Sequence, residues 1–341
     1  MQKPTRRRGA ERYAFFVKLL MNEKDYNKQI DEALELNKGG KIQESISVLS
    51  NIFEDILAND IKALGLVGWL FIQGNELSKA LYCFQKAVES NPNSPGVLRG
   101  LGRVYLELSE HEKAQDNFTK SLALEEDEGA YTFLGVAFLR QDMITEAREA
   151  FSKAIKLNPN YEEAYYNFGV TFRGENPRKT IKFFKKAIEI DPEYSIAYRE
   201  LGWCLRHLNK LPKALDYLNK AIELDDKDGW SYIYLGNTLW ADGNLIKAEK
   251  AFRKAIEVWP EVSIGYWCLA FFYERQDKSE KAKKNYQKAL ELDPDDIEAN
   301  LRFGIFLKES GESQKAKRYL EHVISFEPDN SKTTLALADI N

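Results

Sequence analysis

A short block of residues recurs along the chain and usually ends at a proline. Copies read ALYCFQKAVESNP, AREAFSKAIKLNP and AKKNYQKALELDP, and the five closing prolines are Pro92, Pro159, Pro192, Pro260 and Pro294. Their spacings of 67, 33, 68 and 34 residues indicate a unit of about 34 residues, with diverged copies inside the double intervals. A unit this small cannot bury its apolar stripe alone. The sequence therefore predicts a continuous stack of units rather than separate globular domains.

A second motif, a large apolar residue followed by a small one, lies upstream of each block. Its copies are Val67-Gly68, Leu101-Gly102, Leu134-Gly135, Phe168-Gly169, Leu201-Gly202, Leu235-Gly236, Leu269-Ala270 and Phe303-Gly304. The small residues, together with alanines in the block such as Ala80, Ala114, Ala147 and Ala248, would let two helices approach closely. The Asn-Pro and Asp-Pro steps would end the second helix. Each unit is therefore predicted to be a helix–turn–helix.

This pattern resembles the tetratricopeptide repeat family. One copy matches its signature at Gly135, Phe138, Ala147, Phe151, Ala154 and Pro159. Eight copies follow one another from Ile61 to Asn330, and a degenerate copy precedes them with Ala33, Leu36, Ser45, Leu49 and Ile52 in the equivalent places. The resemblance implies an all-α fold, a right-handed α-solenoid superhelix of about nine repeats over residues 26–330.

Three regions depart from the regular pattern. Thr180 replaces the small alanine in a copy whose turn, RGENPRK, is short, and we expect a local bend there rather than a break. Residues 1–25 form a basic segment with an apolar stretch from Tyr13 to Met21, which would either cap the first repeat or dock on another chain. Residues 331–341 are predicted to form a short C-terminal capping helix.

The stretch DGWSYIYLGNTLWADGN suggests that the first helix of a repeat has two apolar faces. At about 100° per residue, Tyr232, Leu235, Gly236 and Leu239 share one arc and build the helix–helix seam. A second arc holds Trp230, Ile233, Asn237 and Trp240. The family resemblance implies that first-helix positions 2, 5, 6, 9, 12 and 13 line a concave groove.

Applied to every repeat, this register predicts a partner-binding groove rich in aromatic residues and arginine, which is the composition of binding hot spots. Its candidates are Trp69, Arg99, Arg103, Phe133, Arg140, Tyr166, Asn167, Arg173, Arg199, Trp203, Arg206, Trp230, Tyr234, Asn237, Trp240, Trp267, Phe271 and Arg302. Ten basic and six acidic residues at these positions give the groove a predicted charge near +4 (10 − 6), although the whole chain carries −4. The alternative is that some of these rings are buried between neighbouring first helices.

The remaining signals favour a non-catalytic protein. A pI of about 5.7 argues against bulk nucleic-acid binding, and no apolar run is long enough for a membrane span. The sequence has no phosphate-binding glycine loop, HExxH motif or nucleophile elbow, and its three cysteines are scattered, so neither cofactor nor metal is expected.

We therefore expect a cytoplasmic scaffold or adaptor that binds a peptide or helix of a protein partner, with apolar anchors and acidic residues. Two alternatives remain: a regulatory or inhibitory subunit that covers an enzyme, transporter or toxin, and a groove for a saccharide or another non-peptide ligand. The carboxylate clamp of chaperone-binding repeats does not match, because Thr132, Ile196 and Glu200 stand where basic or amide groups belong. The oligomeric state and the partner's identity stay open.

Overall fold

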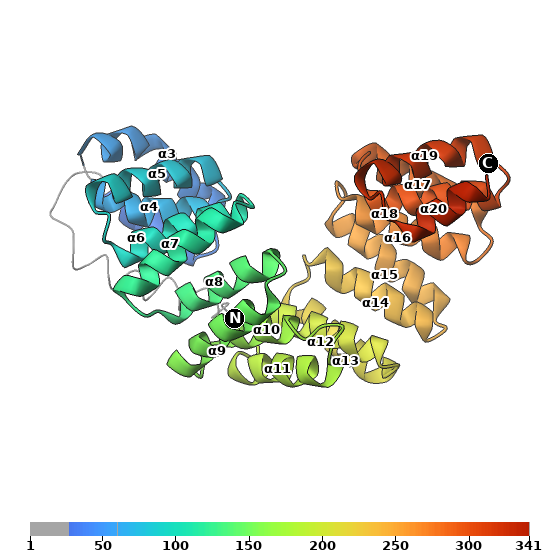
Figure 1. Cartoon of the computed structure of the whole chain (residues 1–341), viewed down its shortest axis with the longest axis horizontal. Helices are drawn as coiled ribbons and strands as arrows, with labels where there is room; N and C mark the ends of the chain where they lie inside the picture. The colour runs from blue at the N-terminus through green and yellow to red at the C-terminus, as the bar shows by residue number, and fades with distance from the viewer. Residues whose placement is uncertain (1–26, 60, 341) are drawn as a thin grey trace. The chain divides into compact units, whose positions relative to one another are not determined.

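The structure is a computed structural model that describes the backbone of residues 27–59 and 61–340 and the side chains of residues 28–53 and 63–340. Within these ranges the chain forms nineteen helices, α2 to α20, and no strand (Figure 1). The fold is an all-α solenoid, as predicted. The expected N-terminal segment, residues 1–25, lies outside the described part of the chain.

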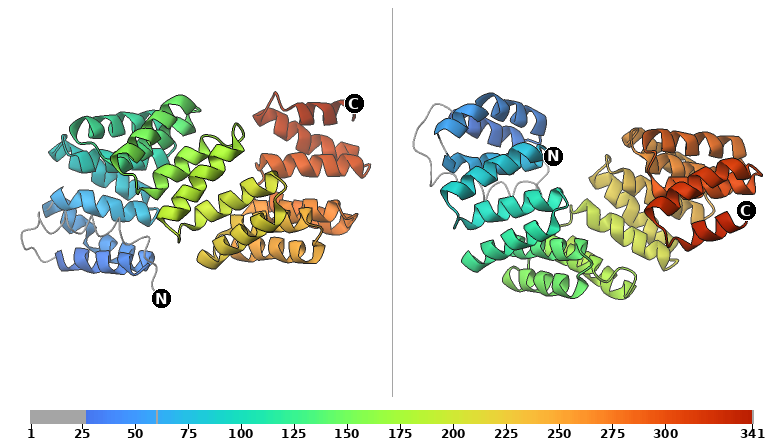
Figure 2. Two further views of the ribbon diagram at one scale, coloured as in Figure 1. Left: turned by 90° about the horizontal axis from the view of Figure 1, so that it is seen from below. Right: turned by 45° about the horizontal axis from the view of Figure 1, so that its top comes forward.

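The helices form two compact units, and each consists of consecutive helical hairpins (Figure 2). In every hairpin we call the first helix A and the second helix B. The unit ending at Tyr194 contains α2 (Asn27–Lys38) with α3 (Ile42–Asn59), α4 (Ile61–Gln73) with α5 (Leu77–Ser90), α6 (Pro95–Glu107) with α7 (His111–Leu124), α8 (Glu128–Arg140) with α9 (Ile144–Leu157), and α10 (Glu162–Val170) with α11 (Pro177–Ile190). The unit beginning at Ser195 contains α12 (Ser195–His207) with α13 (Leu211–Leu224), α14 (Gly229–Ala241) with α15 (Leu245–Val258), α16 (Ser263–Glu274) with α17 (Ser279–Leu292), α18 (Ile297–Glu309) with α19 (Ser313–Phe326), and finally α20 (Ser331–Ala338).

A small residue facing a large ring builds the seam inside each hairpin. In the α8–α9 hairpin, Ala147 and Phe151 are fully buried. A Cβ atom on Gly135 would lie only 2.6 Å from the Phe151 ring, so glycine is required for this close approach. Gly236 meets Phe252 in the same way at 2.8 Å. The prediction that the small residue of the first motif lets helix A approach the large residues of helix B is confirmed.

The α10–α11 hairpin departs from the regular unit. Helix α10 has nine residues, whereas α8 has thirteen, and residues 171–175 form turns instead of continuing the helix. Arg148 on α9 stabilises this turn by donating hydrogen bonds to the Thr171 carbonyl at 2.7 Å and to its hydroxyl at 3.2 Å. The buried Thr180 hydroxyl donates to the Asn176 carbonyl at 3.3 Å. The departure expected at Thr180 therefore takes the form of a shortened A helix.

Helix α20 follows the last hairpin and has one buried side. Ala336 is 5% exposed and belongs to an apolar cluster with Leu301, Leu320 and Val323, while Leu337 packs against the cluster's edge. Leu335, on the other side of the helix, is 68% exposed. These contacts suit the capping role that the sequence suggested for residues 331–341, which stays a prediction.

Candidate interaction surface

We use the term A-helix face for the side chains at positions 2, 5, 6, 9, 12 and 13 of the A helices. In the unit ending at Tyr194, arginines on α6 stack on rings of the neighbouring A helices. The Arg99 guanidinium lies 5.8 Å from the Trp69 ring centre, and that of Arg103 lies 4.6 Å from the Phe133 ring centre. Both arginines are half-buried, and a guanidinium above an aromatic ring is attracted by the ring's quadrupole. Each of these two arginines is therefore paired with a ring of a neighbouring A helix.

These two arginines also have carboxylate partners within the chain. Arg99 pairs with Asp127 at 2.5 Å, and Arg103 pairs with Glu107 at 2.6 Å. Asp127 is the N-cap of α8, where its side chain accepts a hydrogen bond from the Ala130 amide. Arg99 therefore ties one A helix to the start of the next.

The other candidates in this unit have mixed surroundings. Tyr166 is half-buried, stacks on Phe184 and meets Tyr194 edge-on. Asn167 donates to the Glu163 carbonyl at 2.9 Å, so its amide nitrogen is engaged by its own helix. Arg140 is exposed at the end of α8.

The helical position predicted for Arg173 is wrong. Because α10 ends at Val170, Arg173 lies in the turn after the helix and not at position 12 of an A helix. The short A–B connection leaves too few residues for both a full helix and a turn.

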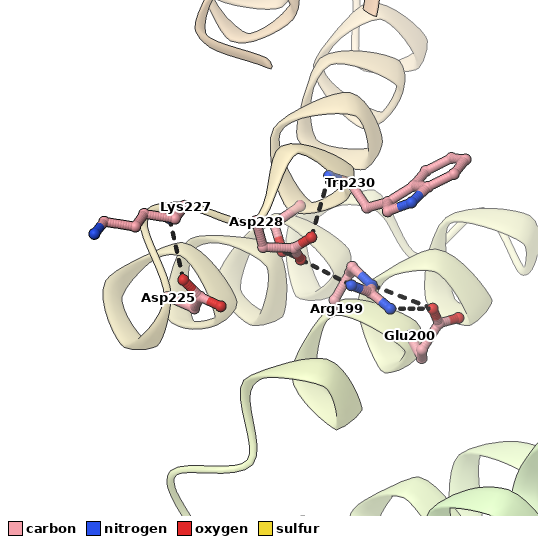
Figure 3. A network of polar contacts seen from close by, with 7 residues as sticks. Arg199, Glu200, Asp225, Lys227, Asp228 and Trp230 are labelled. Atoms are coloured by element: carbon pink, nitrogen blue, oxygen red, sulfur yellow. Dashed lines mark hydrogen bonds and ion pairs between the residues drawn. The ribbon is translucent and has the colours of Figure 1, made fainter. Parts of the chain in front are cut away.

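In the second unit, a buried ion-pair network joins α12 to the N-terminus of α14 (Figure 3). Arg199 pairs with Glu200 at 3.1 Å and with Asp228 at 2.9 Å, and the three side chains are 15%, 5% and 12% exposed. Asp228 is the N-cap of α14 and also accepts a hydrogen bond from the Ser231 hydroxyl at 2.6 Å. This network stabilises the junction between two repeats. Arg199 is therefore held by Glu200 and Asp228, and its side chain exposes little surface to a ligand.

Trp230 projects from the first turn of α14, next to this network (Figure 3). It is 36% exposed, and the centre of its ring lies 5.7 Å from that of Tyr234 and 6.5 Å from that of Trp259. Trp259, the tryptophan outside the predicted groove, is half-buried over Gly229, where a Cβ atom would lie 2.5 Å from its ring. The Trp230 ring therefore packs against Tyr234 and Trp259 and leaves part of its surface exposed to solvent.

Trp240, Trp267 and Phe271 lie deeper than Trp230. The Trp240 ring meets Phe271 at 5.6 Å and the fully buried Phe272 at 5.5 Å, both edge-on. The Arg302 guanidinium lies 5.0 Å from the Trp267 ring and 4.3 Å from the Phe271 ring, and it pairs with Glu298 at 2.5 Å. All three rings are half-buried against the apolar core of this unit. They serve the packing between A helices and also show part of their surface.

Near the end of α12, Trp203 and Arg206 are both half-buried. The Trp203 ring lies 4.1 Å from that of His207, and Arg206 donates a hydrogen bond to His207 Nε2 at 3.0 Å. Partial burial lowers the pKa of Arg206, while nearby Tyr234 opposes that shift. Asn237, on α14, is half-buried as well.

Two expectations about this face need correction. Ile233, predicted on the open arc, is 2% exposed because it packs into the core between neighbouring repeats. The predicted groove charge near +4 ignored acids outside the register. Two of its arginines, Arg99 and Arg199, pair with such acids, Asp127 and Asp228.

Sequence reasoning missed the pairing of two N-cap aspartates, Asp127 and Asp228, with arginines of the preceding A helix. Each stands directly before an A helix and has an arginine at position 5 of the preceding A helix. An aspartate before a helical run is a recognisable N-cap signal. A search for arginines one repeat upstream of such a cap could have found both pairs.

The fold and its repeating seam define a solenoid of helical hairpins. Family models match five stretches: "YpiA-like, C-terminal tetratricopeptide repeats" at residues 264–330, "TPR repeat" at 135–173, and "Tetratricopeptide repeat" at 83–116, 183–216 and 229–262. The chain belongs to the tetratricopeptide repeat family. Proteins of this family mediate protein–protein interactions.

Relatives and solved structures support this assignment. The chain is 26% identical to the BBSome complex member BBS4 of Bos taurus over 143 residues, which is 41% of this chain and 27% of the relative. It is 27% identical to a small glutamine-rich tetratricopeptide repeat-containing protein 2 of Mycosarcoma maydis over 92 residues, or 27% of this chain and 26% of the relative. The chain thus spans about a quarter of the length of these curated relatives.

Two solved structures share the fold. A tetratricopeptide repeat protein from Parabacteroides merdae superposes with a TM-score of 0.56 at 19% identity, covering 72% of this chain and 98% of that one. The APC/C hetero-tetramer Cut9-Hcn1 gives a TM-score of 0.60 at 18% identity, covering 77% and 52%.

In the part of the chain that the structure describes, no helix has the length and apolar character that a bilayer crossing requires. In the same part of the chain, no cluster of histidine, cysteine and acidic side chains has a metal-binding arrangement.

Proposed function

We propose that this chain is a non-catalytic interaction scaffold whose A-helix face binds a peptide segment or helix of a partner protein in the cytoplasm. The observation that carries the proposal is the position of Trp230. It is 36% exposed on an A helix, while the seam of its hairpin is built by Gly236, Phe252 and Ala248. A tryptophan that is partly exposed to solvent and does not build the seam between helices A and B is the kind of side chain that dominates binding energies.

The surroundings of Trp230 support the same conclusion. Tyr234 lies beside it on α14, and Trp203 lies on the A helix of the preceding repeat. Rings held in place by neighbouring side chains lose little conformational freedom when a partner binds. The relative BBS4 is named as a member of the BBSome complex, which agrees with a scaffold role.

Affinity capture with chemical cross-linking and mass spectrometry tests this function. The full chain is used as bait beside Trp230→Ala and a matched control, Ile246→Ala. Ile246 is 86% exposed but lies on the B helix α15. We expect a partner that binds the wild type and the control alike and binds Trp230→Ala about 30-fold more weakly, the equivalent of 2 kcal/mol. Equal capture by all three baits would refute the role of this face.

The same capture separates an adaptor from a regulatory subunit. An adaptor joins two partners in one complex, whereas a regulatory subunit changes the activity of one. If a captured enzyme changes its rate on addition of the chain, the regulatory alternative replaces the adaptor.

A further inference from the structure

The basic residues on the A helices of the second unit differ in how their charges are balanced. Arg199 has Glu200 and Asp228, and Arg302 has Glu298. Lys308, at position 12 of α18, pairs with Asp339 at 2.5 Å. These three cations are therefore compensated within the chain.

Arg206, at position 12 of α12, is different. Its hydrogen bond goes to the His207 ring, and among the side chains that the structure describes no carboxylate lies within ion-pair distance of it. It is nonetheless half-buried, and this burial lowers its pKa. A guanidinium that has lost part of its hydration without gaining a counter-ion is costly unless a ligand supplies one.

The rings around Arg206 show what such a ligand must look like. Trp203 precedes it by one turn of α12 and packs on His207 at 4.1 Å between ring centres. Tyr234 lies on the next A helix, and the centre of its ring is 5.7 Å from that of Trp230. An apolar residue on these rings would bring a neighbouring side chain of the same peptide to the guanidinium, and the fork of donors on arginine matches a carboxylate.

We propose that Arg206 is a specificity-determining residue of the A-helix face and binds an aspartate or glutamate side chain of the partner segment, next to an apolar residue seated on Trp203 and Tyr234. This inference rests on the proposed function. It adds a defined position at which the partner must be acidic. Arg199 and Arg302, although they belong to the same face, are excluded from this role because their counter-ions are internal.

The test is a selection of short random peptides displayed on phage. It is carried out in parallel on the full-length wild type, Arg206→Gln, Arg206→Lys and a matched control, Arg318→Gln, whose arginine is exposed on the B helix α19. We expect wild type and control to enrich peptides that combine an acidic residue with aromatic or aliphatic residues. These peptides should bind Arg206→Gln at least about tenfold more weakly. Arg206→Lys should restore part of that affinity, because it keeps the charge but not the fork.

A double-mutant cycle then locates the contact. Changing the acidic residue of a selected peptide to its amide should weaken binding to the wild type and have no further effect on Arg206→Gln. Selected peptides without acidic residues, or with equal affinity for wild type and Arg206→Gln, would overturn this inference and leave the proposed function standing. If the wild type enriches no peptide at all, the proposed function fails as well. Melting curves of all four proteins show that each is folded.

Discussion

Gly100→Ala tests the seam between repeats, because the methyl group it adds has no room. Gly100 lies on α6, and a Cβ atom there would be 2.2 Å from the ring of Phe84 on the preceding B helix. Phe84 is fully buried, so its ring cannot swing away. Overpacking of this kind costs about 1–3 kcal/mol, and an overlap of more than an ångström belongs at the upper end. Alanine returns up to about 1 kcal/mol through its higher helix propensity.

The expected loss is therefore about 2 kcal/mol of unfolding free energy. Gly96 provides the control on the same helix, because a Cβ atom there meets nothing within 4 Å. Gly96→Ala should be as stable as the wild type or slightly more stable. Urea unfolding followed by circular dichroism should place the Gly100→Ala midpoint roughly 1 M below that of the wild type. If the two alanine variants unfold at the same midpoint, the seam is not packed as described.

Three further predictions concern side chains of both units. Trp240→Ala should cost about 2–3 kcal/mol of stability, at least about 1 kcal/mol more than Trp230→Ala, because Trp240 packs on the buried Phe272; urea unfolding of both variants measures the difference. Partial burial acts to raise the pKa of Glu249, but hydrogen bonds from Tyr273 and Arg253 outweigh it and hold that pKa below its ordinary value. The stability it contributes is present above the unfolded pKa and lost as pH falls through the folded one, so the advantage of wild type over Glu249→Gln should shrink between about pH 6 and pH 3 in thermal melts. Burial raises the pKa of the Cys83 thiol to about 12 and also raises that of Cys268. A thiol reagent at about pH 8 should therefore modify the three buried cysteines, Cys83, Cys204 and Cys268, only after denaturation. Rapid labelling of the native protein would contradict their burial.

The repeat seam could be predicted from sequence because equivalent positions make the same packing contact in each repeat. Gly135 and Phe151 meet as their spacing predicted, and so do Gly236 and Phe252. Each contact lies within one hairpin, where helical periodicity alone determines which residues face each other. The shortening of α10 was harder to foresee, because it depends on Arg148 reaching the turn from the preceding repeat.

The A-helix face was predicted less well, because its side chains interact between repeats. Ile233 was placed on the open arc although it is buried, since periodicity within one helix does not show how closely the next A helix approaches. Likewise, counting charges at register positions could not show that Arg199 is neutralised by Asp228, which lies outside the register. The sequence predicted the aromatic character of this face, but the pairing of its charges depends on contacts between repeats, which periodicity within one helix does not show.

Hydroxyl-radical footprinting tests the central claim most directly, because it measures the solvent exposure of individual side chains. The chain is oxidised alone and in complex with a captured partner or a selected peptide, and the modified residues are quantified by mass spectrometry. We expect oxidation of Trp230 and Tyr234 to fall on binding, while that of Ile246 and Phe326 on the B helices, which are 86% and 53% exposed, stays unchanged. Protection of Ile246 or Phe326 with unchanged oxidation of Trp230 would contradict this expectation.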